Sequence, residues 1–599
     1  MKSPSGAVCL MVAVMLFAIG AVVHIALGDF PKAIDVLPDE RRYLEIARSL
    51  FASGSLIMRG DPSDFQKILY PLSLFPALLF DDGQAQIRAV NVLNSLYACS
   101  AVFPALLIAR RIFENNWAVI ASLVFTALIP DTMYSLTFMS ESLYLPVALW
   151  MVYLCWRSFE AEGSLGIALS VLSGLLGYAT YLCKEVAWMF PIAFAAWHIV
   201  AAVRKRRSAK RSAACIASFA AGFFIPFVIL KLTLFTGLFN SYAQFSFDIL
   251  LSPYTVLFGI YSLFTDGVYF VVGFGVFPVL YLACTYRNME REKRDLLFFC
   301  LLSLAIGLAV VVFTISMRED VGHVALRQHL RYVAPLMLPL LMLFMKQVAR
   351  LDVSKITASP RRLSVLVATT VGFCVLVATM FGSGNLNQGF DYAEFHFMHW
   401  FLKDFSEPLA QDFFDSWNQT MSAIDTGDGD LLVIEPLIWL SRAAVIAFTA
   451  IGMALLLHRS ERVRLRAGGV ICAIIAIMMI ANAAAMVHYN RDAYDVEQPE
   501  IDEICTISDQ LEGREEPGDV LVVLDKANTR PNNLIDTYLQ DGRGEYDYVE
   551  VARFKGRNLD NVDYILKNTD QDIDLDDLDV VKIGGSDGEG ARFELYKVE

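Results

Sequence analysis

Residues 5–28 read SGAVCLMVAVMLFAIGAVVHIALG and contain no Asp, Glu, Lys or Arg. A helix of roughly 20 apolar residues spans the ~30 Å hydrocarbon core of a bilayer, so this stretch is long enough to cross a membrane. Similar runs recur along the 599 residues, of which 56% are hydrophobic and 19% charged. This composition excludes a soluble globular chain and predicts a polytopic α-helical membrane protein. Because further spans follow, we expect the first run to be a retained helix and not a cleaved signal peptide.

The repeated apolar runs predict about 13 transmembrane helices. Their approximate ranges are 5–28, 87–109, 117–135, 141–157, 165–182, 186–203, 213–236, 267–285, 296–316, 332–349, 363–382, 437–457 and 467–488. Cytoplasmic loops of membrane proteins are enriched in Lys and Arg. With a cytoplasmic N-terminus, all five basic clusters fall on the cytoplasmic side: 110–111, 204–211, 287–294, 346–362 and 459–466. We therefore predict a multi-pass plasma-membrane protein whose C-terminus lies outside.

Four loops and the C-terminal segment are predicted to lie on the outer side. The loops are 29–86, 237–266, 317–331 and 383–436. From residue 490 onward, 29 acidic residues stand against 12 basic ones, whereas the whole chain has a net charge of −14, so the acidity belongs to this segment. We divide the chain into a membrane domain, 1–488, and a small acidic soluble α/β domain, 489–599. Strands are expected at 519–524, 546–554, 561–567, 580–583 and 593–598, and a helix at 532–539.

The first outer loop contains PDERRYLEIA, residues 38–47. This stretch predicts a helix, because proline suits the first helical position and acids suit the first turn. Asp39, Arg42 and Tyr43 share one face of such a helix, which we expect to lie along the membrane surface. The carboxylate is suited to take a proton from an acceptor, and the guanidinium is suited to receive the charge of a departing phosphate. The alternative is an ordinary interfacial helix with a capping acid and surface charges.

Charged residues at the outer ends of spans are further candidates. Glu141 begins an apolar span, where an acid is costly unless it is paired or functional; alternatively, the helix dipole favours an acid there. Lys184 lies between two spans with almost no loop, where we expect it to pair with Glu185 or to snorkel to water. The stretch HLRYVAPLMLP, residues 329–339, begins another span, and its Arg331 is placed to bind phosphate or lipid headgroups.

Several of these stretches resemble motifs of a known family. DERRY, residues 39–43, resembles the first-loop motif of the GT-C glycosyltransferases, specifically the group of the lipid A aminoarabinose transferase and the protein O-mannosyltransferases (glycosyltransferase family 39-like). FQKILYPL, residues 65–72, is similar to a family segment in which a lysine precedes a Pro-Leu helix entry. The stretches around Lys184 and Arg331 are similar to two further family helix ends. The resemblance covers roughly residues 1–488.

The resemblance implies a GT-C fold and roles for particular residues. It gives Asp39 as the general base and Glu141 as a second catalytic carboxylate. The ligands that it implies for the donor phosphate are Arg42, Lys67, Lys184 and Arg331. The residues expected to line the substrate are Glu40, Tyr43 and Tyr332.

The implied reaction transfers a sugar from a polyprenyl-phosphate-linked donor, with inversion, to a glycolipid, polysaccharide or protein of the cell envelope. We expect no cofactor and no nucleic-acid partner, because several cations can neutralise the phosphate without a metal. A divalent metal at Asp391, Glu394, His396 and His399 is the weaker hypothesis, since this spacing is not a recognised zinc signature. The alternatives are a secondary transporter or flippase for a lipid or polar solute, and an inactive envelope scaffold. Span centres that are nearly free of charge favour the transferase over the transporter.

Overall fold

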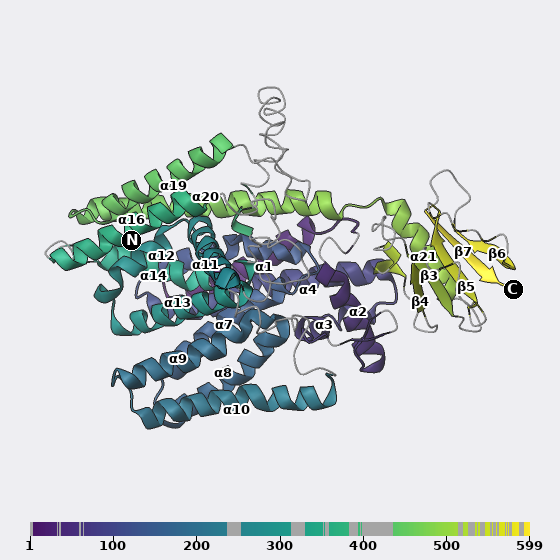
Figure 1. Ribbon diagram of the computed structural model, residues 1–599, viewed down its shortest axis with the longest axis horizontal. Coiled ribbons are helices and arrows are strands. Elements are labelled where there is room, and N and C mark those ends of the chain that lie inside the picture. The colour runs from purple at the N-terminus through teal and green to yellow at the C-terminus, as the bar shows by residue number, and fades with distance from the viewer. Residues whose placement is uncertain are drawn as a thin grey trace.

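Long helices form most of this computed structural model, and a small sheet lies at one end of its longest axis (Figure 1). The structure describes residues 4–32, 34, 38–58, 61–63, 65–235, 253–312, 330–351, 353, 359–381, 393–395, 397, 435–512, 519–524, 534–535, 537–539, 546–550, 554, 559, 562–569, 571, 573, 575, 578–585 and 592–599.

The membrane part consists mainly of long helices. They are α1 (Gly6–Leu27), α4 (Gly83–Cys99), α5 (Val102–Ile112), α6 (Asn116–Leu128), α7 (Glu141–Glu160), α8 (Gly163–Cys183), α9 (Met189–Val203), α10 (Ala209–Thr233), α11 (Pro253–Gly273), α12 (Phe277–Thr285), α13 (Arg291–Val311), α14 (Met337–Arg350), α16 (Pro360–Met380), α19 (Glu435–Leu456) and α20 (Glu461–Tyr494). The short 3-10 helices that matter for the site are η2 (Pro130–Leu136), η3 (Glu185–Trp188) and η8 (Leu330–Tyr332).

Large apolar side chains stay exposed along several of these helices. Val22 of α1 is 67% exposed and Leu232 of α10 is 82% exposed. Water would penalise such a surface, whereas lipid tails would not. The exposed apolar faces therefore agree with a protein that crosses a bilayer several times.

Each predicted span contains at least one helix, but the predicted number of spans is not confirmed. Within the described residues, 9 helical segments are long and apolar enough to cross a membrane, or up to 11 if two bent pairs count as one span each. The other two predicted spans correspond to α7 and α14. Helix α14 has only 14 residues, and α7 is less apolar because it carries Glu141, Arg157 and Glu160. A multi-pass membrane protein is confirmed, and the count of 13 is not.

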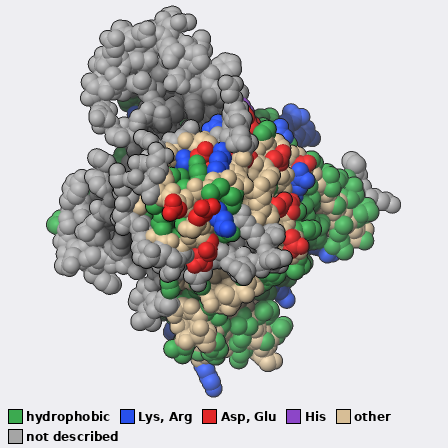
Figure 2. Space-filling view, turned by 90° about the vertical axis from the view of Figure 1, so that its right-hand side faces the viewer, with side chains coloured by type: hydrophobic (Ala, Val, Ile, Leu, Met, Phe, Trp, Pro, Cys, Tyr) green, Lys and Arg blue, Asp and Glu red, His purple; other side chains and the backbone are tan. Residues whose placement is uncertain are grey.

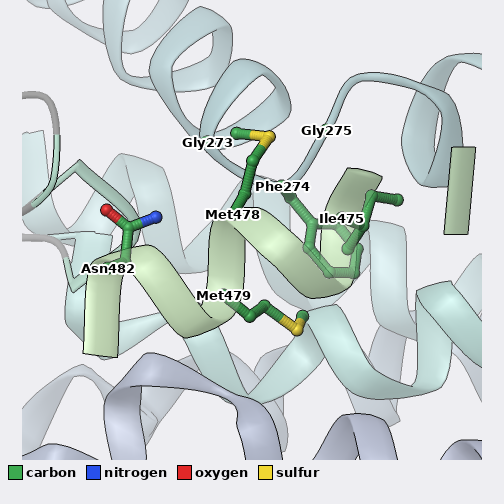
Figure 3. A pocket seen from close by; sticks show the side chains of 7 residues that line it. All are labelled: Gly273, Phe274, Gly275, Ile475, Met478, Met479 and Asn482. Carbon is green, nitrogen blue, oxygen red and sulfur yellow. The ribbon is translucent and has the colours of Figure 1, made fainter. Parts of the chain in front are cut away.

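The span predicted at 267–285 is broken. Helices α11 and α12 meet at an angle of 105°. Gly275 has a φ of +77°, and a Cβ there would lie 2.7 Å from the Cγ1 of Ile475 in α20, so both the backbone and the close approach require glycine. Figure 3 shows this turn packed against α20, with Met478 and Met479 of α20 lining a small pocket beside it.

The first outer loop folds into short elements beside the membrane helices. It contains α2 (Pro38–Ser53), the two-residue strands β1 (Ile57–Met58) and β2 (Asp61–Pro62), α3 (Leu69–Ser73) and the 3-10 helix η1 (Ala77–Leu79). The helix predicted at 38–47 is confirmed and continues to Ser53. Figure 1 shows α2 and α3 at the end of the membrane part that faces the C-terminal sheet.

The C-terminal segment forms a five-stranded mixed sheet with the order β4-β3-β5-β7-β6. Its strands are β3 (Val520–Leu524), β4 (Tyr546–Glu550), β5 (Tyr564–Asn568), β6 (Val580–Gly584) and β7 (Phe593–Val598). Strand β3 is parallel to β4 and β5, whereas β7 is antiparallel to β5 and β6. All five predicted strands are present, and α21 (Gln498–Glu512) is a helix that the sequence analysis missed. Figure 2 shows acidic and basic side chains together on this end of the molecule.

Candidate active site

The start of α2 carries the predicted base. Asp39 lies in the first turn, and its Oδ2 is 2.7 Å from the Nζ of Lys67. Its Oδ1 is 3.8 Å from an Nη of Arg42, one turn further along the helix. The Lys67 side chain is 3% exposed, whereas that of Arg42 is 43% exposed. One carboxylate oxygen is therefore held from inside the protein, and the other faces the outer side of the site.

A second carboxylate is surrounded by cations. Glu141 begins α7, and its Oε1 is 3.0 Å from the Nζ of Lys184 and 3.0 Å from the Nε of Arg331. Lys184 lies at the break between α8 and η3, and Arg331 lies in η8, so three separate elements meet here. All three side chains are buried. Because unpaired charges are costly in such a place, each of them needs the others.

Two tyrosine rings bring the two carboxylates into one site. The Nζ of Lys67 is 5.6 Å from the centre of the Tyr43 ring, and the Nζ of Lys184 is 5.9 Å from the same centre. Lys184 is also 5.0 Å from the centre of the Tyr332 ring. Cations at these distances are attracted to an aromatic face. The Tyr43 ring is thus near both lysines, and the Tyr332 ring is near Lys184.

The charges set the protonation states in the outer loop. Burial by itself raises the pKa of Asp39, but Lys67 and Lys184 outweigh it and hold that pKa well below its ordinary value. Burial by itself lowers the pKa of Lys67, but Tyr43 and Asp39 outweigh it and hold that pKa above its ordinary value. Asp39 is therefore ionised and Lys67 is protonated at neutral pH.

The site has more cations than carboxylates. Arg42, Lys67, Lys184 and Arg331 supply positive charge. Asp39, Glu141 and the buried Glu185, whose charge acts on Lys67, supply negative charge. The remaining positive charge is suited to a phosphate group, which accepts charge-assisted hydrogen bonds from guanidinium and ammonium groups. Eight of the nine predicted site residues therefore lie close together. They are Asp39, Arg42, Tyr43, Lys67, Glu141, Lys184, Arg331 and Tyr332.

Glu40 lies in a different environment from Asp39. Its side chain is fully buried, and its Oε1 accepts hydrogen bonds from the backbone N–H of Phe138 at 2.8 Å and from the hydroxyl of Tyr494 at 2.7 Å. These bonds satisfy a buried carboxylate and tie α2 to the segment before α7 and to the end of α20. That Glu40 also lines the substrate stays a prediction.

Several polar residues behind the site escaped the sequence analysis. The hydroxyl of Tyr43 is 3.0 Å from that of Ser140, and the hydroxyl of Tyr144 donates to the carbonyl of Tyr332 at 2.9 Å. The hydroxyl of Tyr181 donates to Oε1 of Gln66 at 3.0 Å, next to Lys67. Tyrosines inside apolar runs are usually core residues, so their positions gave no signal. Ser140, directly before Glu141, is the hydroxyl that contacts Tyr43.

The weaker metal hypothesis concerns the histidine-containing stretch of the large outer loop. Asp391, His396, His399 and the side chain of Glu394 lie outside the described residues. Among the residues that the structure describes, there is no group of three or more His, Cys, Asp and Glu side chains arranged to hold a metal ion.

Comparison with known proteins gives structural similarities only. No family model matches the sequence, and no curated protein matches it. The chain is similar to the crystal structure of ArnT from Cupriavidus metallidurans bound to undecaprenyl phosphate, with 13% identity, 97% of each chain covered and a TM-score of 0.49. It is similar to the arabinosyltransferase EmbB from Mycobacterium smegmatis, with 13% identity, 80% of this chain and 41% of the other covered, and a TM-score of 0.40. It is also similar to the Archaeoglobus fulgidus oligosaccharyltransferase, with 12% identity, 93% and 69% covered, and a TM-score of 0.39.

Two of these solved structures are named as transferases, an arabinosyltransferase and an oligosaccharyltransferase. At these identities and scores, the assignment of a function rests on the residues and geometry of the site.

Proposed function

We propose that the chain is a GT-C membrane glycosyltransferase that uses a polyprenyl-phosphate-linked sugar as donor. The acceptor is a glycolipid, a polysaccharide or a protein of the cell envelope, and transfer takes place on the outer face of the membrane. The observation that carries this proposal is the 2.7 Å contact between Asp39 and the buried Lys67, in one site with Lys184 and Arg331. A base and a set of phosphate ligands are the two parts that such a reaction needs.

The reaction is a single displacement at the anomeric carbon. An oxygen or nitrogen of the acceptor forms a bond to this carbon while the bond from the carbon to the phosphate oxygen breaks. Asp39 takes the proton of the acceptor, and the electron pair leaves with the lipid phosphate. Lys67, Lys184 and Arg331 neutralise the charge that develops on the leaving group.

A carboxylate with a low pKa is a weak base, and the pKa of Asp39 is low in the empty site. It is low because Lys67 and Lys184 stand beside the carboxylate. A donor phosphate that takes hydrogen bonds from the same two lysines weakens their hold on Asp39 and raises its pKa. Asp39 thus becomes a stronger base when the donor is bound, whereas its low pKa limits proton removal in the empty site.

Glu141 has a different role from Asp39 in this proposal. Both of its close contacts are to the phosphate-binding cations Lys184 and Arg331. Glu141 therefore orients these two side chains and offsets part of their charge while the site is empty. It is a positioning residue, in contrast to the second catalytic carboxylate that the sequence predicts.

The orientation in the membrane follows from the proposed chemistry. Nucleotide sugars are cytoplasmic, so a transferase that works outside needs a sugar carried on a lipid. The proposed orientation has a cytoplasmic N-terminus and an outer C-terminal domain, in agreement with the basic clusters of the sequence. No metal or other cofactor is required, because the protein's own cations face the phosphate.

Release of free polyprenyl phosphate tests the proposal directly. Purified protein in liposomes is supplied with a panel of polyprenyl-phosphate sugars and with a membrane extract as the source of acceptors. The expected result is time-dependent release of polyprenyl phosphate from at least one donor. If no donor is consumed while a lipid or solute is carried across the liposome membrane, the transporter hypothesis replaces this one.

A further inference from the structure

The last residue of the longest membrane helix contacts the helix that carries the proposed base. Tyr494 ends α20 and is fully buried, and its hydroxyl donates to Glu40 at 2.7 Å. Glu40 follows Asp39 directly in the first turn of α2. The second bond to Glu40, from the N–H of Phe138, fixes the same carboxylate from the segment before α7. Two distant parts of the chain thus hold one residue beside the base.

The C-terminal domain contacts the same loop at two further points. The hydroxyl of Tyr538 donates to the carbonyl of Lys32 at 2.6 Å, ahead of α2. An Nη of Arg48, within α2, donates to the carbonyl of Thr537 at 2.8 Å. The backbone of Lys32 also pairs with that of Asp495, the residue after α20. These contacts bracket the turn of α2 that carries Asp39.

A neighbouring element strengthens this attachment. At the start of α4, the side-chain amide of Gln84 donates to Asp502 of α21 at 3.0 Å, and that of Gln498 donates to Gln84 at 3.1 Å. The C-terminal domain is therefore bonded to the helix that follows the first loop as well as to the loop itself.

From these contacts we infer that the end of α20 and the C-terminal domain clamp α2 and thereby position Asp39, with Tyr494 as the positioning residue next to it. This inference rests on the proposed function only for the role of Asp39; the clamp itself does not depend on it. Most of the stability of a helix in a protein comes from tertiary packing, so the placement of the 16-residue α2 depends on such contacts. A buried carboxylate also requires its hydrogen bonds, which makes the Tyr494–Glu40 contact a strong point of attachment.

Tyr494→Phe tests the clamp, because it removes one hydroxyl and keeps the ring. Tyr596→Phe is the matched control: Tyr596 also donates to a carboxylate, that of Glu594 at 3.0 Å, but within the C-terminal sheet. We expect Tyr494→Phe to speed up amide hydrogen exchange in α2 by about tenfold, as the loss of a hydrogen bond to a charged group predicts. Tyr596→Phe leaves exchange in α2 unchanged.

Kinetics separate positioning from a general loss of structure. Because the phosphate ligands remain, Tyr494→Phe lowers kcat by about tenfold and leaves the KM for the donor within about twofold, since small displacements of a catalytic group are costly. Glu40→Gln retains an oxygen that accepts both hydrogen bonds, so its kcat stays closer to that of the wild type than the kcat of Glu40→Ala. Tyr538→Phe also lowers kcat, but by less than Tyr494→Phe.

The outcomes are distinguishable. Unchanged exchange in α2 in both Tyr494→Phe and Tyr538→Phe overturns the clamp. Faster exchange with an unchanged kcat overturns the positioning of Asp39. If the wild-type protein consumes no donor, the proposed function fails, and the exchange measurement still decides whether the clamp exists.

Discussion

The Nζ of Lys67 lies 2.7 Å from Oδ2 of Asp39, so the proposed base and a proposed phosphate ligand form an ion pair before any substrate is present. The pair joins the start of α2 to the segment before α3. A donor phosphate would compete with Asp39 for Lys67. This relationship links donor binding to the activation of the base, and it leads to the first prediction.

Lys67→Met is expected to weaken donor binding and to raise the pKa of Asp39 towards its ordinary value. Loss of a hydrogen bond between charged groups costs about 1.5–3 kcal/mol, which corresponds to roughly 10- to 100-fold in the Kd for polyprenyl phosphate. Calorimetric titration of the protein in nanodiscs measures this Kd. Lys582→Met is the control, because Lys582 pairs with Glu594 at 3.5 Å in the C-terminal sheet. Equal affinity in Lys67→Met and wild type would remove Lys67 from the phosphate site.

Glu141→Gln is expected to lower thermal stability. The substitution leaves the buried cations Lys184 and Arg331 without their carboxylate, and breaking a buried ion pair typically costs about 3–5 kcal/mol. Glu162→Gln is the matched control, because Glu162 forms an exposed pair with Arg211 at 3.4 Å. The control should not change the melting temperature measurably. A melting temperature of Glu141→Gln equal to that of the control would show that the buried cluster does not depend on its carboxylate.

Lys32 gives stability a dependence on pH. Burial lowers its pKa from 10.5 to about 7, although Glu40 and Asp29 partly oppose the shift. Between about pH 7 and 10.5 the unfolded state binds the additional proton, so stability rises with pH by up to about 1.4 kcal/mol per unit in this window. Melting temperatures of wild type and Lys32→Met across this range measure the effect. We expect a smaller rise in Lys32→Met, and parallel curves would contradict the assignment.

Gly275→Ala is expected to destabilise the turn between α11 and α12. Alanine is strained at a φ of +77°, and its Cβ would press on Ile475, which together cost about 1–3 kcal/mol. Gly372→Ala in α16 is the control, because a Cβ at Gly372 meets nothing within 4 Å. In a helix interior this change is neutral or slightly stabilising. Thermal unfolding followed by tryptophan fluorescence should separate the two variants, and equal melting temperatures would argue against the tight turn.

Apolar length predicted the helices well and their interruptions poorly. Residues 267–285 are continuously apolar, so nothing in their hydropathy marks the break at Gly275, where the backbone has a φ of +77° and lies close to Ile475 of α20. Helix α21 was missed although its buried residues recur at helical spacing: Ile501, Ile504, Ile507 and Leu511. Local pattern therefore predicts elements, and contacts between distant elements decide how they bend and dock.

In the candidate site, too, spacing along one helix was predictable, whereas contacts between distant residues were not. Asp39, Arg42 and Tyr43 share a helix face, and this grouping followed from their spacing. The ion pairs of Glu141 with Lys184 and Arg331 join residues far apart in sequence, and spacing gave no reason to pair them. The same holds for Glu40 and Tyr494, which are 454 positions apart. The motif resemblance indicated which charged residues belong to the site, and the structure shows which of them pair with one another.

Transfer by Asp39→Asn, compared with wild type, tests the central claim most directly. The control is Asp579→Asn, which makes the same change at an exposed position of the C-terminal domain. With a donor that the wild type consumes, we predict that kcat of Asp39→Asn falls by at least about 10²-fold, as loss of a general base requires, while Asp579→Asn keeps wild-type activity. If Asp39→Asn transfers sugar as fast as the wild type, Asp39 is not the base and the account of the site is wrong.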